Sequence, residues 1–255
     1  MSELKQRVIT GVIGSIVLIA IILQGGLLLQ GAILLLSLEV VRELYNAFRK
    51  INITINIPVL ILGCLLLFGF HILDISLEFS IIAVLFLSFI TLLFKDDMEL
   101  QDVSFTLLSF IYGPYLLNLL YGLEQQMIYL VFIIAFSTDT FAYFVGSSIG
   151  KHKLIPKVSP NKSIEGSIGG VLGCLILTLI YFKYINLPIS IVAVLFIIVA
   201  SISGQVGDLI ASKIKRVTGI KDYAKILPGH GGILDRFDST ILVIPFVYML
   251  QYFLF

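Results

Sequence analysis

Charged residues are scarce in this sequence. Of its 255 residues, only 13% are charged and 58% are hydrophobic, and the mean hydropathy is +1.06. A soluble domain of this length would need a charged exterior, which seventeen basic and sixteen acidic side chains cannot provide. We therefore expect lipid to be the solvent for most of the surface, which predicts an integral membrane protein with several spans. The net charge of +1 says nothing useful about partners.

Cysteine is scarce too. Cys64 and Cys174 both lie within apolar runs and lack the spacing of a metal site or redox motif, so we expect them to be small apolar packing residues. The first residues, MSELKQR, resemble the basic flank of a signal peptide. However, the apolar run over residues 8–24 is long, and no small-residue cleavage site follows it. We expect this run to be retained as the first span.

Motifs for several kinds of catalysis are missing as well. No Gly-rich loop ending in Lys-Ser or Lys-Thr occurs, which argues against a P-loop ATPase. A transition-metal site fits poorly at residues 221–239, because neither cysteine is near them and His230 has no partner at ligand spacing. We expect His71 and His152 to be incidental. No Ser/His/Asp activation system is evident.

Long apolar runs are abundant instead. Backbone amides in hydrocarbon must be satisfied within the segment, so each run should be helical. The second run is expected to continue as a charged extension through VRELYNAFRK. The sequence thus predicts an all-α integral membrane protein of about nine spans. The nine segments are 8–24, 27–41, 57–73, 80–94, 106–123, 127–150, 168–185, 189–212 and 240–255.

The basic residues indicate an orientation. With a cytoplasmic N-terminus and nine alternating spans, sixteen of the seventeen basic residues fall on the inner side, and only Lys183 falls outside. The outer connections are short, whereas the inner ones are long and polar. We therefore expect the C-terminus outside, and a polar catalytic cavity at the cytoplasmic side of the C-terminal half.

Two carboxylates interrupt apolar segments. Asp139 and Asp208 each cost a few kcal/mol at such a position, so they should face a polar cavity, pair with a cation or bind a metal. An interhelical hydrogen bond or ion pair is the structural alternative. Asp208 belongs to a polar stripe at helical spacing. The stripe consists of Ser201, Gln205, Asp208, Ser212 and Lys215.

The densest polar stretch, KDYAKILPGHGGILDRFDS, spans residues 221–239. Pro228 and three glycines around His230 exclude a regular helix and let the backbone approach a ligand. Asp235 and Asp238 lie three apart where the last helix should begin, so both can point the same way. Arg236 between them supplies a planar cation. Further positive charge upstream comes from Lys213, Lys215, Arg216, Lys221 and Lys225.

Carboxylates beside many cations suit a polyphosphate bound with a divalent ion. Hard oxygen ligands hold Mg²⁺, and Lys and Arg neutralise the remaining phosphate charge. A second polar segment on the same side, KHKLIPKVSPNKSIEGSIGG at residues 151–170, could form the opposite wall of the cavity. A solvated loop is its alternative. The positive-inside bias and attraction to anionic headgroups would account for the lysines alone, but not for three aspartates, a histidine and a glycine cluster.

Three segments of the C-terminal half resemble those of a known family. SKIKRVTGIKDYAKILPGHGGILDRFD, residues 212–238, resembles the signature of the phosphatidate cytidylyltransferases (CDP-diacylglycerol synthases). DTFAYFVGSSIGKHKL and SPNKSIEGSIGG resemble two further blocks of that family, with Ser163 where Thr is more usual. The resemblance covers roughly residues 130–255, and the N-terminal half is similar only in being apolar.

The resemblance implies the reaction CTP + phosphatidate → CDP-diacylglycerol + pyrophosphate, dependent on Mg²⁺, with a second cation left open. The implied partners are CTP, phosphatidate and membrane lipids, with no nucleic acid and with a homodimer left open. The implied location is a bacterial cell membrane, with the active site facing the cytoplasm. Residues 126–255 would form the catalytic region and residues 1–125 the scaffold or lipid contact of a single integral domain.

Residue roles follow from the same resemblance. The implied metal ligands are Asp208, Asp235, Asp238 and Asp139. Asp208 and Asp235 are also expected to be catalytic. The other residues expected to act in catalysis or to hold phosphates are Lys215, Arg216, Lys221, Arg236 and His230. The residues expected to line the substrate site are Lys151, Ser159, Lys162, Glu165, Ser212, Asp222, Gly231 and Gly232, with an orienting role for Asp222 as the alternative.

Three other functions remain open from the sequence. The same chemistry could act on an ether-lipid analogue, or a related fold could be a CTP-dependent polyprenol kinase. An ion-coupled transporter would use Asp139 and Asp208 to carry ions or protons. A transporter should show two related halves, whereas the polar residues here gather in the C-terminal half.

Overall fold

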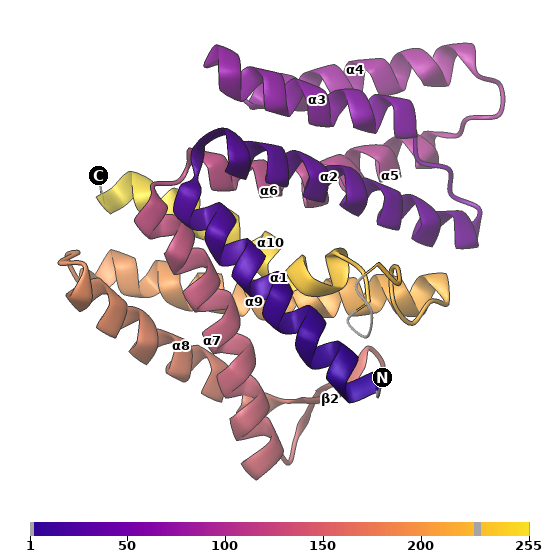
Figure 1. Ribbon diagram of the computed structural model, residues 1–255. Helices are drawn as coiled ribbons and strands as arrows, with labels where there is room; N and C mark the ends of the chain where they lie inside the picture. The colour runs from indigo at the N-terminus through magenta and orange to yellow at the C-terminus, as the bar shows by residue number, and fades with distance from the viewer. Residues whose placement is uncertain (1–2, 227–230, 255) are drawn as a thin grey trace. The chain divides into compact units, whose positions relative to one another are not determined.

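The computed structural model describes residues 3–226 and 231–254, which are mostly helical (Figure 1). The helices are α1 Glu3–Gln24, α2 Gly26–Phe48, η1 Arg49–Ile51, α3 Ile57–Leu73, α4 Glu78–Phe94, α5 Leu100–Phe110, η2 Ile111–Tyr115, α6 Leu116–Asn118, η3 Leu119–Gly122, α7 Gln125–Ile149, α8 Ile164–Tyr184, α9 Ile191–Thr218 and α10 Leu234–Leu254. Two short strands, β1 Lys153–Ile155 and β2 Ser159–Ser163, pair antiparallel between α7 and α8.

Each apolar segment predicted from the sequence falls on helical structure, which confirms an all-α membrane protein. The segment 57–73 coincides with α3, and α2 continues through VRELYNAF as expected. Five stretches of the described chain are long and apolar enough to cross a membrane. They are Leu100–Gly122, Gln125–Ile149, Ile164–Tyr184, Ile191–Thr218 and Leu234–Leu254. The count of nine spans and their orientation stay predictions.

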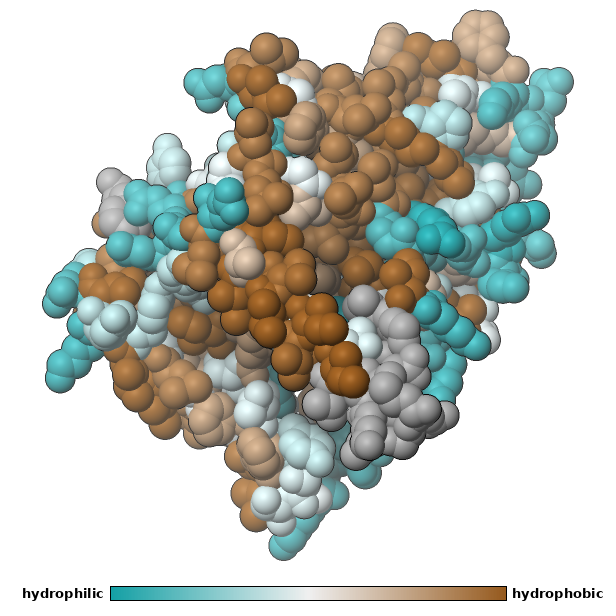
Figure 2. All heavy atoms as spheres, in the orientation of Figure 1, coloured by the Kyte–Doolittle hydropathy of each residue, from teal (hydrophilic) through white to brown (hydrophobic). Residues whose placement is uncertain are grey.

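Large apolar side chains remain exposed on the helices, as a lipid solvent requires. On α8, Ile168, Leu172 and Ile176 share one exposed face. Figure 2 shows broad areas of such side chains on the visible face. These faces have no polar cover of their own, so they are suited to contact acyl chains.

The chain divides into two compact units. Unit 1 comprises Met1–Tyr121 and Ile214–Arg236, and unit 2 comprises Gly122–Lys213 and Phe237–Phe255. Helices α9 and α10 are each continuous and contribute residues to both units. Each unit is therefore described by itself.

In unit 1, α2 packs on α3, α3 on α4, and α4 on α5. Val40, Leu60 and Leu67 are fully buried between them. Several buried polar groups there have partners, as burial in an apolar interior favours, whereas the buried hydroxyls of Ser88 and Ser109 have none among the described residues. Gln30 Nε2 donates to the carbonyl oxygen of Phe68 at 2.7 Å, and Asn118 Nδ2 donates to that of Pro114 at 2.8 Å.

In unit 2, α7 and α8 pack along much of their length. Glycines of α8 permit this close approach, because a Cβ at Gly166 would lie 2.7 Å from the carbonyl oxygen of Ala142 and one at Gly170 would lie 2.8 Å from that of Thr138. Small residues at such spacing are typical of helix packing in membranes. The hairpin of β1 and β2 connects the C-terminal end of α7 to the N-terminal end of α8.

Candidate active site

The polar stripe of α9 faces the interior of unit 2 along its first half. Ser201 Oγ lies 2.7 Å from Thr138 Oγ1 on α7, and Gln205 Nε2 donates to the carbonyl oxygen of Ser167 on α8 at 3.1 Å. Both α9 side chains are buried. The opposite face of α9 is apolar and exposed at Ile202, Val206 and Ile210. The stripe predicted from spacing is thus one polar face of one helix.

Asp208, the next residue of this stripe, forms an ion pair with the hairpin. Lys162 Nζ lies 2.5 Å from Asp208 Oδ2, and Ser212 Oγ donates to Asp208 Oδ1 at 3.3 Å. Asp139 on α7 accepts a hydrogen bond from Ser239 Oγ on α10 at 3.1 Å. Four elements of unit 2 therefore supply polar groups to one region.

These groups border a cavity of about 400 Å³ in unit 2. Its polar lining includes two carboxylates, a lysine, two amides and a tyrosine, namely Asp139, Asp208, Lys162, Asn161, Gln205 and Tyr143. The rest of its lining consists of small residues of α7 and α8, such as Gly146 and Gly166, together with Leu154 and Ser163 of the hairpin. The cavity combines apolar lining with a few charged groups, which is the usual make-up of a ligand site.

The strand hairpin holds Lys162 at this cavity. Ser163 Oγ caps α8 by accepting the N–H of Gly166 at 3.1 Å. Glu165 accepts the N–H of Lys151 at 3.1 Å, and one of its oxygens lies 2.6 Å from His152 Nδ1. Glu165, expected to line the substrate site, is thus occupied with the start of the hairpin. His152, expected to be incidental, is its partner.

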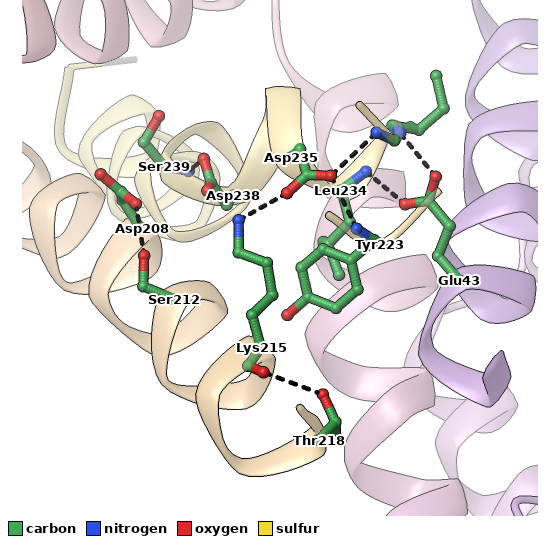
Figure 3. Close-up of polar contacts among 12 residues, drawn as sticks. Glu43, Asp208, Ser212, Lys215, Thr218, Tyr223, Leu234, Asp235, Asp238 and Ser239 are labelled. Carbon is green, nitrogen blue, oxygen red and sulfur yellow. Dashed lines mark hydrogen bonds and ion pairs between the residues drawn. The ribbon is translucent and has the colours of Figure 1, made fainter. Parts of the chain in front are cut away.

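In unit 1, Asp235 joins three segments of the chain (Figure 3). Lys215 Nζ on α9 lies 2.6 Å from Asp235 Oδ1, while Oδ2 accepts the N–H of Tyr223 and that of Gly232, both at 2.9 Å. The Asp235 side chain is only 5% exposed and that of Lys215 only 17%. Lys215 Nζ also lies 5.5 Å from the centre of the Tyr223 ring, a cation–π contact.

Glu43 on α2 is a residue that the sequence analysis missed. It is fully buried, and its two oxygens accept the N–H of Ile233 and of Leu234, both at 2.7 Å (Figure 3). A detectable signal was present, because Val40, Glu43 and Leu44 lie at helical spacing on one face. An acidic residue on an otherwise buried apolar stripe indicates a specific partner.

Asp238 is buried in unit 2 on the second turn of α10. Its Oδ1 accepts the N–H of Ser239 at 2.8 Å. Helix α9 approaches α10 closely at this level, because a Cβ added at Gly207 would collide with the carbonyl oxygen of Asp238.

Comparison with known proteins places the chain in a family. Residues 5–254 match the model of the cytidylyltransferase family. The chain is a member of the cytidylyltransferase family. It is 38% identical to a phosphatidate cytidylyltransferase of Bacillus subtilis, covering 98% of both chains. It is 37% identical to the protein of that name from Staphylococcus saprophyticus and 39% to one from Staphylococcus aureus strain COL, in each case over 97% of this chain and 98% of the relative.

Membership of the cytidylyltransferase family extends to the N-terminal half. The sequence analysis limited the specific resemblance to roughly residues 130–255, and the match from residue 5 corrects this. Glu43 therefore lies within the matched region.

Of the other residues predicted for a cytidylyltransferase site, some are exposed and others are half-buried. Gly231 has φ of +86°, a backbone conformation that favours glycine. Ser159 begins β2, opposite Ile155. His230 lies outside the described residues. The exposed members of the predicted set are Lys151, Arg216, Lys221, Asp222 and Arg236.

The donors present suit a hard cation. Within residues 3–226 and 231–254, no group of three His, Cys, Asp or Glu side chains is arranged to hold a metal. Asp139 and Asp208 nevertheless line one cavity, and Ser212 and Ser239 place hydroxyl oxygens on them. Carboxylate and hydroxyl oxygens are ligands that Mg²⁺ accepts. Asp208 pairs with one cation already, the Lys162 ammonium.

Proposed function

We propose that this chain is a phosphatidate cytidylyltransferase of a bacterial cell membrane. The proposal is carried by the match over 98% of the chain to a relative of that name. The polar cavity bordered by Lys162 and Asp208 supports it, because it offers both signs of charge to a nucleotide polyphosphate.

The reaction transfers a cytidylyl group between two anions. An oxygen of the phosphatidate phosphate attacks the α-phosphorus of CTP, a new P–O bond forms, and the bond to the β-phosphate oxygen breaks, so that pyrophosphate leaves. The nucleophile is already ionised, so no base needs to remove a proton. The difficulty is to bring two anions together and stabilise the charge on the leaving group, which calls for positioning and electrostatics.

The carboxylates are proposed to bind divalent metal. Asp139, Asp208, Asp235 and Asp238 are the proposed Mg²⁺ ligands, with a second cation as a further proposal. At Asp235, Oδ2 accepts two backbone N–H groups and Oδ1 pairs with Lys215, so a metal ion at Oδ1 would have to displace that lysine. When bound, Mg²⁺ would supply positive charge to the triphosphate and the departing pyrophosphate.

The cations are proposed to bind phosphates. Lys215 and Lys162 are held by carboxylates and so are oriented before substrate arrives. Four other cations are exposed, and their long side chains can reach phosphate groups of a bound substrate. They are Arg216, Lys221, Arg236 and Lys151. His230 and Gly231 are proposed to shape the nucleotide end.

The remaining predicted residues are proposed to support this site. Ser159 lies on the hairpin strand that leads to Lys162, and Ser212 holds Asp208. Gly232 leaves room for the chain near Glu43. Asp222 is proposed to orient a neighbouring lysine.

The topology is also proposed. Nine spans with a cytoplasmic N-terminus would place the polar connections on the side where CTP is available. Phosphatidate would stay in the inner leaflet, so neither substrate would cross the membrane. Residues 1–125 and 126–255 would act as parts of one integral domain, and a homodimer remains one arrangement to test.

The direct test is an assay with purified protein, phosphatidate and CTP labelled at the α-phosphate. We expect label to enter the lipid phase as CDP-diacylglycerol and pyrophosphate to appear in equal amount. ATP in place of CTP should give no labelled lipid. A water-soluble label throughout would overturn the proposal. In that case CTP labelled at the γ-phosphate is the second probe, and transfer of this label to a polyprenol would replace the proposal with a kinase.

A further inference from the structure

Helix α2 supplies a carboxylate to the start of α10, within unit 1. Glu43 and the amides of Ile233 and Leu234 are separated by 190 and 191 residues in the sequence. The two oxygens of Glu43 are each used by one N–H at 2.7 Å. The first N–H groups of a helix have no partner within the helix. Glu43 therefore caps α10 from outside its own segment.

The same backbone segment carries Asp235. Gly232 donates its N–H to Asp235 Oδ2, and the next two N–H groups go to Glu43. Three consecutive amides are thus shared between two carboxylates. Asp235 follows directly after Leu234, so the path fixed by Glu43 sets where the Asp235 carboxylate lies. That carboxylate in turn holds Lys215 at 2.6 Å.

Gly232 is matched to this arrangement. A Cβ at residue 232 would collide with the Glu43 carboxylate. The backbone therefore approaches Glu43 closely only because residue 232 has no side chain. The contact therefore depends on both residues, the glycine at 232 and the buried glutamate at 43, although they are far apart in the sequence.

We propose that Glu43 is a positioning residue of the active site. It does not touch substrate; it fixes the Ile233–Leu234 amides and thereby the Asp235–Lys215 pair. This inference rests on the proposed function for its catalytic consequence. It gives the N-terminal half a part in catalysis beyond scaffold and lipid contact.

Glu43→Gln tests this with little change in size. Glutamine keeps one acceptor oxygen but turns an NH₂ group toward the other backbone N–H, so one of the two bonds is lost. We expect kcat to fall by about 100-fold, the loss that a misplacement of roughly 1 Å can cause, with the KM for phosphatidate unchanged. Glu43→Asp keeps both oxygens and should recover part of the activity. The matched control is Glu39→Gln, one turn earlier on α2, where Glu39 forms an ion pair with Arg42 three residues further along the helix.

Amide hydrogen exchange separates positioning from general stability. In Glu43→Gln, peptides that cover residues 231–236 should exchange faster, while peptides from the hairpin and α8 should exchange as in the unaltered protein. Equal kcat in Glu43→Gln and Glu39→Gln would overturn the inference. Faster exchange throughout both units would also overturn it, because Glu43 would then be a general stability residue. If the unaltered protein made no CDP-diacylglycerol, the proposed function would fail, while unchanged exchange at 231–236 would separately reject the role of Glu43.

Discussion

Lys162 Nζ lies 2.5 Å from Asp208 Oδ2, an ion pair that joins the hairpin before α8 to the middle of α9. The lysine side chain is about one-quarter exposed and the aspartate about one-third, so both remain accessible to a ligand. In the proposed reaction, a triphosphate would take the lysine from the aspartate, and a carboxylate oxygen would then be available to a divalent ion. The pair thus keeps two groups of opposite charge in place before either meets substrate.

Lys162→Ala should lower kcat/KM by about 100-fold, because a preorganised cation next to the reacting phosphate is removed. Steady-state CDP-diacylglycerol formation measures this. The matched control is Lys183→Ala, an exposed lysine near the end of α8 whose loss should leave the rate unchanged. Equal rates in the two variants would exclude Lys162 from the site.

Lys215→Met should destabilise the protein by about 3 kcal/mol, because the buried carboxylate of Asp235 loses its cationic partner. Unfolding in mixed micelles, followed by circular dichroism, measures the change. Lys213→Met, at an exposed position two residues earlier, should have little effect. Similar unfolding curves for the two variants would mean that the Lys215–Asp235 pair adds no stability.

Glu165→Gln should loosen the hairpin without unfolding the helices. Glu165 accepts the N–H groups of Lys151 and His152 and contacts the His152 ring, so its loss frees the first residues after α7. Limited trypsin digestion should then cut faster at Lys151 and Lys153, and CDP-diacylglycerol formation should fall. Glu124→Gln, an exposed residue before α7, is the control. Unchanged cleavage at Lys151 and Lys153 would show that Glu165 does not hold the start of the hairpin in place.

Gly232→Ala should lower activity and stability together, because the added Cβ collides with the Glu43 carboxylate. Overpacking of this kind costs about 1–3 kcal/mol. Gly31→Ala is the control, since a Cβ there meets nothing within 4 Å. Thermal unfolding and the product assay on both variants give the comparison. A fully active, equally stable Gly232→Ala would show that the segment can move away from Glu43 at no cost.

The helices were predictable because lipid forces each apolar segment to satisfy its own amides. The polar stripe of α9 was predictable for a similar local reason, since residues three and four apart share a face. Ser201, Gln205 and Asp208 indeed have partners on α7, α8 or the hairpin.

Contacts between distant segments could not be read in this way. Glu43 and Leu234 are 191 residues apart, and no local pattern names the partner of a buried glutamate. Glu165 was predicted to line the substrate site, and its contact with His152 could not be predicted because the turn of the chain brings the two residues together. Sequence spacing thus predicts which face a side chain takes, and only tertiary packing decides what it meets.

The central claim is that carboxylates of this cavity bind the divalent ion that lets two anions react. The most direct measurement is CDP-diacylglycerol formation as a function of Mg²⁺ concentration, for the unaltered protein, Asp208→Asn and the exposed control Asp96→Asn. We predict no product in EDTA, and for Asp208→Asn a higher Mg²⁺ requirement with kcat/KM about 10²–10³-fold lower. The same Mg²⁺ dependence and rate in Asp208→Asn as in Asp96→Asn would contradict the account.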